Sequence, residues 1–480
     1  MLIGAVDVGS ARARAGLFTL DGRLVARASR GFATIPGPDQ QAMYHFAEIW
    51  QAVADALTEA RHQAGVPPAQ IGALAFDATC SLVVDAPGFS PDVIAWHDHR
   101  AVAEAAELSR IPHEVVVRAG GSVSPEMQTP KLMWLKRNRP GIWATLNGVR
   151  DLCDHLTFRA TGIEARSLCA AVAKWAWLPD HGGWQQDLLE RAGVADFPRP
   201  GPVLSPGSRI GPLSPQGAAE LRLKQETLVA TGLIDAFAGA LGAAPGMPAL
   251  IAGTSNCVIA AGIGPRTSLW GPYPGAILPD ESVTEGGQSA TGALLERLRA
   301  LYPEPTDHDV ILARIASAPE PAADLHVLPD IKGNRTPFAD PLLRAVIQGL
   351  TLERSPEALD ALYWRAAVGI ALGTRQVIAH MGLIPQALAM AGGQARSPLL
   401  RQLYADAIGA EIHWQPEDAV LRGTAILAAA PLSGGVLAAR DRFARPIEVT
   451  KPDPAACIRR ERDWRIFLRM QEQRAEIAAM

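Results

Sequence analysis

One short pattern occurs twice in this chain: an apolar run, a turn of small polar residues, and a second apolar run. The first copy extends from Leu2 to Phe18 and turns at Asp7-Val8-Gly9-Ser10. The second extends from Leu250 to Ala261 and turns at Gly253-Thr254-Ser255. Each copy predicts two buried strands joined by a tight turn. Two such hairpins, one near the start of each half, indicate an internal duplication, with two similar domains facing a nucleotide.

The first turn has the composition of an anion site. Gly9 lets backbone N–H groups approach an anion closely, and Ser10 adds a hydroxyl donor. Asp7 places a carboxylate beside that anion, which is favourable if a divalent cation bridges the two. An ordinary strand that ends in a turn explains this stretch equally well, so the interpretation depends on the rest of the chain.

Length and composition set the broad class. A chain of 480 residues is too long for one core, which predicts two large domains. With 48% hydrophobic and 20% charged residues and a net charge of −4, the chain is typical of a globular protein, and nucleic acid is disfavoured as a partner. We find no signal peptide and no apolar run long enough for a membrane helix, so no membrane partner is expected. The five scattered cysteines fit reduced thiols, and we expect a cytoplasmic location.

Three polar clusters follow predicted strands. A strand over 71–76 leads into Asp77-Ala78-Thr79-Cys80-Ser81, and Ile94-Ala95 leads into Trp96-His97-Asp98-His99-Arg100. A third strand, over 227–234, ends at Asp235 ahead of a helix of small residues. Ligands of open α/β sheets bind where strands end, so these clusters are candidate site residues. The charged helix predicted over 453–480 is interpreted as a solvated face.

Four motifs, in this order and spacing, resemble the FGGY carbohydrate kinases, which include glycerol, xylulose and ribulose kinases. They are Asp7-Val8-Gly9-Ser10 with Arg14, Asp235 before its helix, Gly253-Thr254-Ser255-Asn256-Cys257, and Gly392-Gly393-Gln394-Ala395-Arg396-Ser397. The resemblance covers essentially the whole chain.

Within that family the chain is most similar to the pentulose kinase branch that includes D-ribulokinases. Five further segments carry this likeness: Asp77 to Val83, Trp96 to Ala101, Pro125 to Lys131, Glu285 to Gly292, and Gly333 to Pro337.

The resemblance implies an α/β fold with two actin-like (ribonuclease H-like) domains flanking a deep catalytic cleft. Residues 1–243 would form the N-terminal FGGY domain, with the sugar site and the catalytic base. Residues 244–480 would form the C-terminal, nucleotide-binding domain. The resemblance is also compatible with a homodimer.

It also implies roles for individual residues. Asp235 would be the general base that accepts the proton of the attacking sugar hydroxyl, and Asp7 and Asp235 would be the magnesium-side carboxylates. The implied sugar-binding set is Thr79, Cys80, Trp96, Asp98, Glu126 and Asp235. The implied nucleotide-binding set is Gly9, Ser10, Arg14, Gly253, Thr254, Gly286, Gly287, Gly292, Gly392, Gly393 and Ala395.

The chain departs from the family pattern in places. Ala11 replaces a threonine of glycerol kinase-like members, and Glu126 stands where glycerol kinases carry a substrate-side aromatic residue. The second difference favours a substrate with more hydroxyls than glycerol. Asn256 and Val258 also differ from the commoner residues around their hairpin.

Structural alternatives stay open for some of these residues. Asp235 is alternatively only a helix N-cap. His97 and His99 are more typical of hydrogen-bonded pocket residues than of metal ligands. Arg335 either reaches the cleft or pairs with Asp330 or Asp340.

These observations predict a kinase that uses ATP and Mg²⁺ to phosphorylate a pentulose at a terminal hydroxyl, with D-ribulose converted to D-ribulose 5-phosphate. The alternative is a kinase for another sugar or polyol, such as L-ribulose, ribitol, xylulose or xylitol. An ATPase module of the actin/Hsp70 type is the alternative from a different class.

Overall fold

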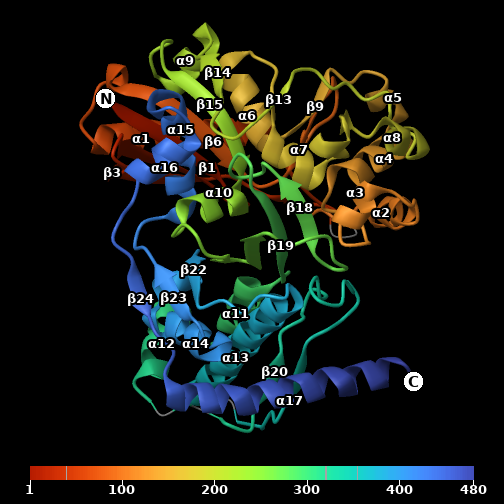
Figure 1. Cartoon of the computed structure of the whole chain (residues 1–480), viewed down its shortest axis with the longest axis vertical. Helices are drawn as coiled ribbons and strands as arrows, with labels where there is room; N and C mark the ends of the chain where they lie inside the picture. The colour runs from red at the N-terminus through yellow and green to blue at the C-terminus, as the bar shows by residue number, and fades with distance from the viewer. Residues whose placement is uncertain (39–40, 319, 321, 354) are drawn as a thin grey trace. The chain divides into compact units, whose positions relative to one another are not determined.

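The computed structural model describes residues 1–38, 41–318, 320, 322–353 and 355–480. The chain forms two compact units, each built from separate segments of the sequence (Figure 1). Unit 1 contains Met1–Gly242, Ala261–Thr284 and Glu417–Arg445. Unit 2 contains Ala243–Ala260, Glu285–Pro416 and Pro446–Met480.

This division differs from the predicted one, in which residues 244–480 form a single domain. Residues 261–284 and 417–445 belong to unit 1, and the reason is packing. Helix α15 (Ala419–Ser433) lies against α10 (Asp235–Gly242) with glycines at the contact. A Cβ on Gly423 would lie 1.9 Å from the carbonyl oxygen of Ala238, so the two helix backbones touch. In Figure 1 the blue α15 accordingly lies among the strands and helices of the first 242 residues.

Unit 1 has a central six-stranded sheet in the order β14-β15-β6-β1-β2-β3. The strands are β14 (Arg209–Pro212), β15 (Leu228–Ile234), β6 (Ile71–Ala78), β1 (Leu2–Val8), β2 (Arg12–Thr19) and β3 (Leu24–Gly31). β1 pairs antiparallel with β2 and parallel with β6, which in turn pairs parallel with β15. β1 is buried at all seven positions, as its continuous apolar sequence predicts for a strand covered on both faces. Helices α1 (Phe46–Gln63), α6 (Leu152–Thr161) and α15 pack on this sheet.

The sheet of unit 2 repeats this arrangement. The strands of this sheet that lie wholly or partly in unit 2 follow the order β19-β17-β16-β22-β23-β24. They are β19 (Ser282–Gln288), β17 (Asn256–Ala261), β16 (Ala249–Ala252), β22 (Ala387–Ala391), β23 (Glu411–Trp414) and β24 (Glu448–Thr450). Strands β19-β17-β16-β22-β23 correspond in order to β3-β2-β1-β6-β15, and each sheet adds an antiparallel edge strand, β24 or β14. The two hairpins noted in the sequence are therefore equivalent elements of a duplicated fold.

A second, five-stranded sheet in unit 1 carries most of the predicted sugar motifs. Its order is β4-β5-β8-β7-β9. The strands are β4 (Ile35–Pro36), β5 (Ala42–Tyr44), β8 (Val93–Ile94), β7 (Leu82–Asp85) and β9 (Gly148–Asp151). Helices α2 (Val102–Ser109) and α4 (Gln128–Asn138) pack against each other; α2 follows the motif at residues 96–100, and α4 begins within the motif at 125–131.

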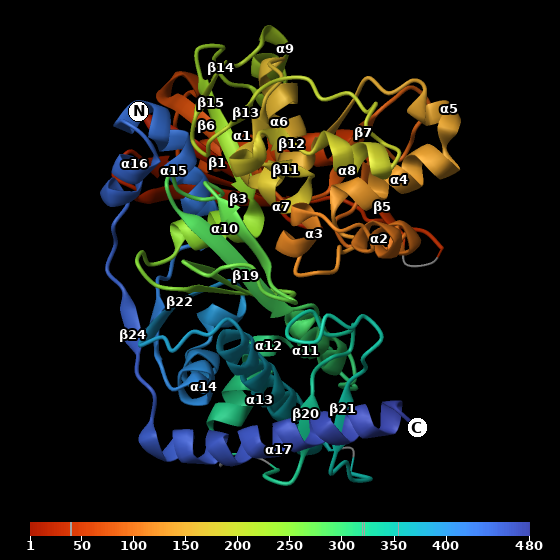
Figure 2. The ribbon, with the colours of Figure 1, turned by 45° about the vertical axis from the view of Figure 1, so that its right-hand side comes forward.

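The helices of unit 2 include α11 (Thr291–Arg299), α12 (His308–Ala316), α13 (Pro356–His380), α14 (Pro398–Ile408) and the C-terminal α17 (Pro454–Ala478). Helix α17 packs on α14 and on β20 (His326–Leu328), as Figure 2 shows. It is not simply a solvated helix as predicted, because Arg460 and Asp463 are only 3% and 6% exposed.

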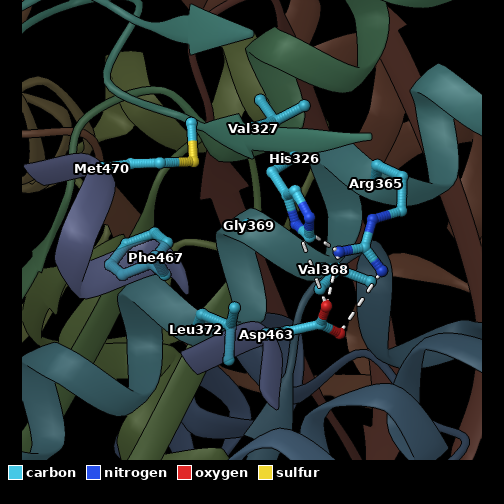
Figure 3. Close-up of a pocket in the computed structure, with 9 residues that line it drawn as sticks. All are labelled: His326, Val327, Arg365, Val368, Gly369, Leu372, Asp463, Phe467 and Met470. Carbon is cyan, nitrogen blue, oxygen red and sulfur yellow. Dashed lines mark hydrogen bonds and ion pairs between the residues drawn. The ribbon is translucent and has the colours of Figure 1, made fainter. Parts of the chain in front are cut away.

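Figure 3 shows how α17 is held. The Asp463 carboxylate faces Arg365 on α13 and His326 on β20, with 2.6 Å between Arg365 Nη2 and Asp463 Oδ1. Phe467 and Met470 line the same small pocket with apolar surface. The helix is thus anchored by a buried ion pair flanked by hydrophobic contacts.

Within the described residues, no single helix has the length and hydropathy to span a membrane. The bent pair of α15 and α16 (Val436–Arg442) passes the same criteria when its two helices are taken together.

Candidate functional site

Three aspartates meet where neighbouring strands of unit 1 end. Asp7 on β1 and Asp77 on β6 are register partners, and Asp235 follows the end of β15 as the first residue of α10. Leu233 of β15 pairs with Asp77, so the third carboxylate joins the same edge of the sheet. Asp7 and Asp77 are fully buried, whereas Asp235 is half-buried. The structure thus brings the predicted metal-side and base residues together and adds Asp77.

The charges at this edge perturb one another. Burial raises the pKa of Asp7 to about 6, with further upward contributions from Asp418 and Asp235 and an opposing one from Arg14. Burial also raises the pKa of Asp77 well above its usual value. Arg14 forms an ion pair with Asp7 and a second one with Asp418, in which Nη1 lies 3.0 Å from Oδ2. Arg14, predicted to bind nucleotide, lies here as the counter-ion of two carboxylates.

The aspartate cluster fits a hydrated divalent cation. Asp7 Oδ1 and Asp77 Oδ1 are buried without a hydrogen-bond partner, although the Thr424 hydroxyl donates to Asp77 Oδ2. Carboxylate oxygens are the ligands that Mg²⁺ prefers, and Mg²⁺ usually keeps several of its waters. No group of three or more His, Cys, Asp or Glu side chains in the described part of the chain is arranged to enclose a metal. Asp7 and Asp77 are the residues that would hold such a cation, because each has a buried oxygen without a hydrogen-bond partner.

Asp235 is the most accessible of the three carboxylates. Its Oδ1 accepts a hydrogen bond from the Ala236 N–H at 2.8 Å, so the side chain does stabilise the start of α10. A carboxylate offers about four acceptor positions, and this bond occupies one of them. Helix stabilisation and proton acceptance are compatible at this position.

The sugar motifs of unit 1 connect directly to the first turn. Trp96 Nε1 donates to Ser10 Oγ at 3.0 Å, and the Trp96 N–H donates to Ser81 Oγ at 3.1 Å. The hydroxyls of Ser81 and Thr79 lie 3.0 Å apart. Thr79 and Trp96 therefore share a hydrogen-bonded cluster with Ser10, and Cys80 is buried beside them.

Asp98 has a different environment from the predicted one. It is fully buried, and its two oxygens accept four hydrogen bonds, one from the Ala42 N–H and three from the backbone and guanidinium of Arg100. A carboxylate offers about four acceptor positions, so none is left for a sugar hydroxyl. Asp98 instead fixes Arg100 and the loop that carries Trp96.

Glu126 keeps the accessibility that a sugar ligand needs. Its side chain is 17% exposed, and Oε1 lies 3.9 Å from His99 Nε2. Neither His97 nor His99 belongs to a metal-binding group among the described residues. His97 packs edge-on against Trp96.

Lys131 is a buried cation outside the predicted set of site residues, although it is the last residue of the Pro125 to Lys131 motif. Its Nζ donates to the carbonyl oxygens of Ala95 and Trp96, at 3.0 and 3.4 Å. Burial lowers the pKa of Lys131 to about 8, against the upward influence of Cys80 and nearby carboxylates. The Pro-Lys pair was the only signal available in the sequence.

In unit 2 the turn between β16 and β17 packs tightly on the start of α11. The N–H groups of Gly292 and Ala293 donate to the carbonyl oxygens of Gly253 and Thr254, both at 3.2 Å. A Cβ on Gly292 would lie 2.4 Å from the Gly253 oxygen. The predicted residues Gly253, Thr254 and Gly292 thus form one loop cluster, in which the close contact requires glycine at position 292.

The loop after β22 lies against β16, the strand that leads into the turn at Gly253. Gly392 has φ +96°, and a Cβ there would lie 2.4 Å from the Ala252 oxygen. A Cβ on Gly393 would meet no atom within 4 Å, so this position borders open space. Ala395 is fully buried, and it supports the loop from within.

Gly286 and Gly287 lie on β19, where Gly287 faces protein. A Cβ on Gly287 would lie 2.1 Å from Arg335 Nη2. Arg335 pairs with Glu285 at 3.0 Å and contacts Cys257 Sγ at 3.2 Å, whereas Asp330 pairs with Arg474. Glu285 is thus a partner of Arg335 that neither of the two alternatives for this residue named.

Two family models match the chain, one in each half. Residues 2–242 match the N-terminal domain of the FGGY family of carbohydrate kinases, and residues 249–432 match its C-terminal domain. A zebrafish FGGY carbohydrate kinase domain-containing protein is 33% identical, over 99% of this chain and 98% of its own. A D-ribulokinase of Saccharomyces cerevisiae is also 33% identical, over 88% of this chain and 71% of its own.

Solved structures share the fold. A ligand-bound xylulose kinase from Lactobacillus acidophilus superposes with a TM-score of 0.84 at 20% identity, over 99% of this chain and 98% of its own. A gluconate kinase from the same organism gives 0.84 at 20% identity, over 98% of both chains. These likenesses support the two-domain α/β architecture.

Proposed function

Since this chain belongs to the FGGY family of carbohydrate kinases, we propose that it transfers the γ-phosphoryl group of ATP to a terminal hydroxyl of a pentulose, with D-ribulose and its O5 as substrate and acceptor. The aspartate cluster beside the Gly9-Ser10 turn is the observation that carries the chemistry. The 33% identity to a yeast D-ribulokinase supports the choice of sugar.

In this proposal the carboxylates divide the work by accessibility. Asp235, half-buried where Asp7 and Asp77 are fully buried, accepts the proton of the attacking hydroxyl. Asp7, fully buried, holds the waters of the cation, while Arg14 keeps the local negative charge partly neutralised. Mg²⁺, when bound, neutralises the charge that develops on the phosphates. Unit 2 holds the nucleotide through the loops at Gly253 and Gly392.

The sugar is recognised by unit 1. Glu126, Thr79 and Trp96 supply polar groups around a shared hydrogen-bonded cluster, and the buried Lys131 supports the Trp96 backbone. A pocket with several fixed polar groups penalises any sugar that leaves one of them unpaired. We assign Asp98 a positioning role, because its acceptors are already used.

Coupled ADP release with Mg-ATP tests this proposal against D-ribulose, L-ribulose, D-xylulose, L-xylulose, ribitol, xylitol and glycerol. Asp235→Asn is measured beside the wild type, with Asp187→Asn as the control because Asp187 is 67% exposed. Preference for D-ribulose, lost only in Asp235→Asn, supports the proposal. Preference for a polyol or another pentulose keeps the kinase and overturns the substrate. Release that ignores every sugar and survives Asp235→Asn favours an ATPase module instead.

A cytoplasmic location and a homodimer stay predictions. The five cysteines are free in the structure, which supports a reducing compartment. Light scattering of the purified protein measures the oligomeric state.

A further inference from the structure

A cluster of six buried polar side chains lies behind the glycine-rich loops of unit 2. The six are Asn256, Gln288, Thr291, Thr374, Gln394 and Tyr404. None is more than 9% exposed. They come from six different elements, so their hydrogen bonds tie together parts of unit 2 that are far apart along the chain.

Three of them form a closed ring. Asn256 Nδ2 donates to the Tyr404 hydroxyl at 2.8 Å, and that hydroxyl donates to Gln394 Oε1 at 2.8 Å. Gln394 Nε2 completes the ring by donating to Asn256 Oδ1 at 3.3 Å. Burial raises the pKa of Tyr404, so its hydroxyl keeps the proton that it donates. Each member both donates and accepts within the ring.

The ring is hydrogen-bonded to three segments of unit 2 that carry predicted glycines: the turn at 253–255, the loop at 392–394 and the start of α11. Gln394 directly follows Gly392 and Gly393, and its Nε2 also donates to the Gly253 oxygen at 3.2 Å. Thr291, at the start of α11, donates to Asn256 Oδ1 at 2.7 Å. The turn at 253–255, the loop at 392–394 and the start of α11 are therefore fixed by one set of hydrogen bonds.

Helix α13 anchors the ring to the core. Asn256 Nδ2 also donates to Thr374 Oγ1 at 3.2 Å, and Gln288 Nε2 donates to the same hydroxyl at 2.9 Å. Thr374 in turn donates to the Ile370 oxygen within α13. The departure at Asn256 noted in the sequence thus has a structural reason, since its amide supplies both donor and acceptor to this network.

We propose that Tyr404 is a positioning residue for the nucleotide, whose hydroxyl sets the relative geometry of the Gly253 and Gly392 loops through Asn256 and Gln394. This inference rests on the proposed function, because the loops matter only if they bind ATP. A fully satisfied buried network is rigid, and a loop that is already in its bound geometry binds with less ordering cost. Loss of the hydroxyl removes the donor that the structure gives Gln394 Oε1. The hydrogen-bonded connection from Asn256 to Gln394 through Tyr404 is then broken.

Tyr404→Phe removes only the hydroxyl and keeps the buried ring. We expect ADP, titrated calorimetrically without sugar, to bind about tenfold more weakly, and the KM for ATP to rise about tenfold. The KM for the sugar and the kcat should change by less than about twofold, because unit 1 is untouched. Asn256→Asp, which replaces the donor facing Tyr404 by an acceptor, should shift ADP affinity in the same direction.

Tyr363→Phe is the matched control. Tyr363 is equally buried on α13, and its hydroxyl bonds to His308 rather than to the network. If Tyr404 has only a structural role, both variants should have a lower unfolding temperature, and the affinity for ADP should fall in neither variant or in both. Either result overturns the inference. Unchanged ADP affinity in Tyr404→Phe, with wild-type protein that binds ADP, also overturns it. Wild-type protein that binds no ADP overturns the proposed function and this inference together.

Discussion

Asp7 and Asp77 lie side by side as register partners on adjacent parallel strands, and both carboxylates are fully buried. Burial is the main reason that the pKa of each acid is raised, and the negative charge of Asp7 raises the pKa of Asp77 further. The structure supplies Arg14 to Asp7 and Thr424 to Asp77, and leaves one oxygen of each acid without a partner. A cation at this edge would relieve both the repulsion and the missing contacts.

Asp7→Asn should therefore weaken the response to magnesium. We expect the free Mg²⁺ concentration for half-maximal activity to rise at least about tenfold and kcat to fall at least about a hundredfold. Initial rates measured against free Mg²⁺ at saturating ATP check this. An unchanged Mg²⁺ response with a lower kcat would contradict the assignment of Asp7 to the cation.

Substitution of Asp98 should lower stability, whereas substitution of Glu126 should weaken substrate binding. Asp98→Ala leaves the buried Arg100 without its carboxylate, and we expect a loss of about 3–5 kcal/mol in the free energy of unfolding. Glu126→Gln should leave that free energy within about 0.5 kcal/mol and raise the KM for the sugar. Denaturant unfolding and sugar titrations measure the two effects. A stable Asp98→Ala protein with a raised sugar KM would return Asp98 to the sugar site.

Gly423 should not tolerate a methyl group. Its Cβ would lie 1.9 Å from the Ala238 oxygen, so Gly423→Ala should destabilise unit 1 by at least about 1–3 kcal/mol, despite the helix preference of alanine. Gly141→Ala is the control, because a Cβ on that glycine in α5 (Pro140–Trp143) meets no atom within 4 Å. Thermal unfolding of the two variants is compared, and equal melting temperatures would contradict the contact between α10 and α15.

His155 should make the protein sensitive to acid. Its ring is half-buried and packs against Phe46 and Phe158, and the loss of solvent around the ring lowers its pKa from 6.5 to about 3. Between those values the unfolded chain binds a proton that the folded chain does not, so stability falls as pH decreases below 6.5. The loss from this group between pH 7 and pH 5 is about 2 kcal/mol.

His155→Phe should flatten that part of the stability profile. Urea unfolding at pH 5, 6 and 7 measures the difference, with His62→Phe on the exposed end of α1 as the control. Parallel profiles for the wild type and His155→Phe would exclude this histidine as the source.

Local pattern was sufficient for the repeated unit of the fold. Continuous apolar runs at 2–8 and 249–252 predict buried strands, and glycine with hydroxyl residues between them predicts the turns. The ends of such strands share one edge of a sheet, so the positions of Asp7 and Asp235 after apolar runs predict that they lie close together, and in the structure the charge of Asp235 does raise the pKa of Asp7.

Contacts between distant segments were not predictable in this way. Nothing local to Asp98 shows that Ala42 and Arg100 use all its acceptors, and nothing near Asn256 shows that Tyr404 and Thr374 lie beside it. The charged sequence of α17 likewise predicts a solvated face, because the buried partner Arg365 is about a hundred residues away. Tertiary hydrogen bonds decide these cases, and they depend on the whole fold.

The return of residues 417–445 to unit 1 has a consequence for the order in which the protein is made. Helix α15 packs on α10 and β1, so the first 242 residues emerge from the ribosome without part of their own core. Unit 2, whose sheet needs β24, is also completed only near the end of the chain. Domains generally fold as units once their residues are available. Neither unit of this protein can finish before residues 417–450 are synthesised, so a truncation ahead of residue 417 removes part of both units together.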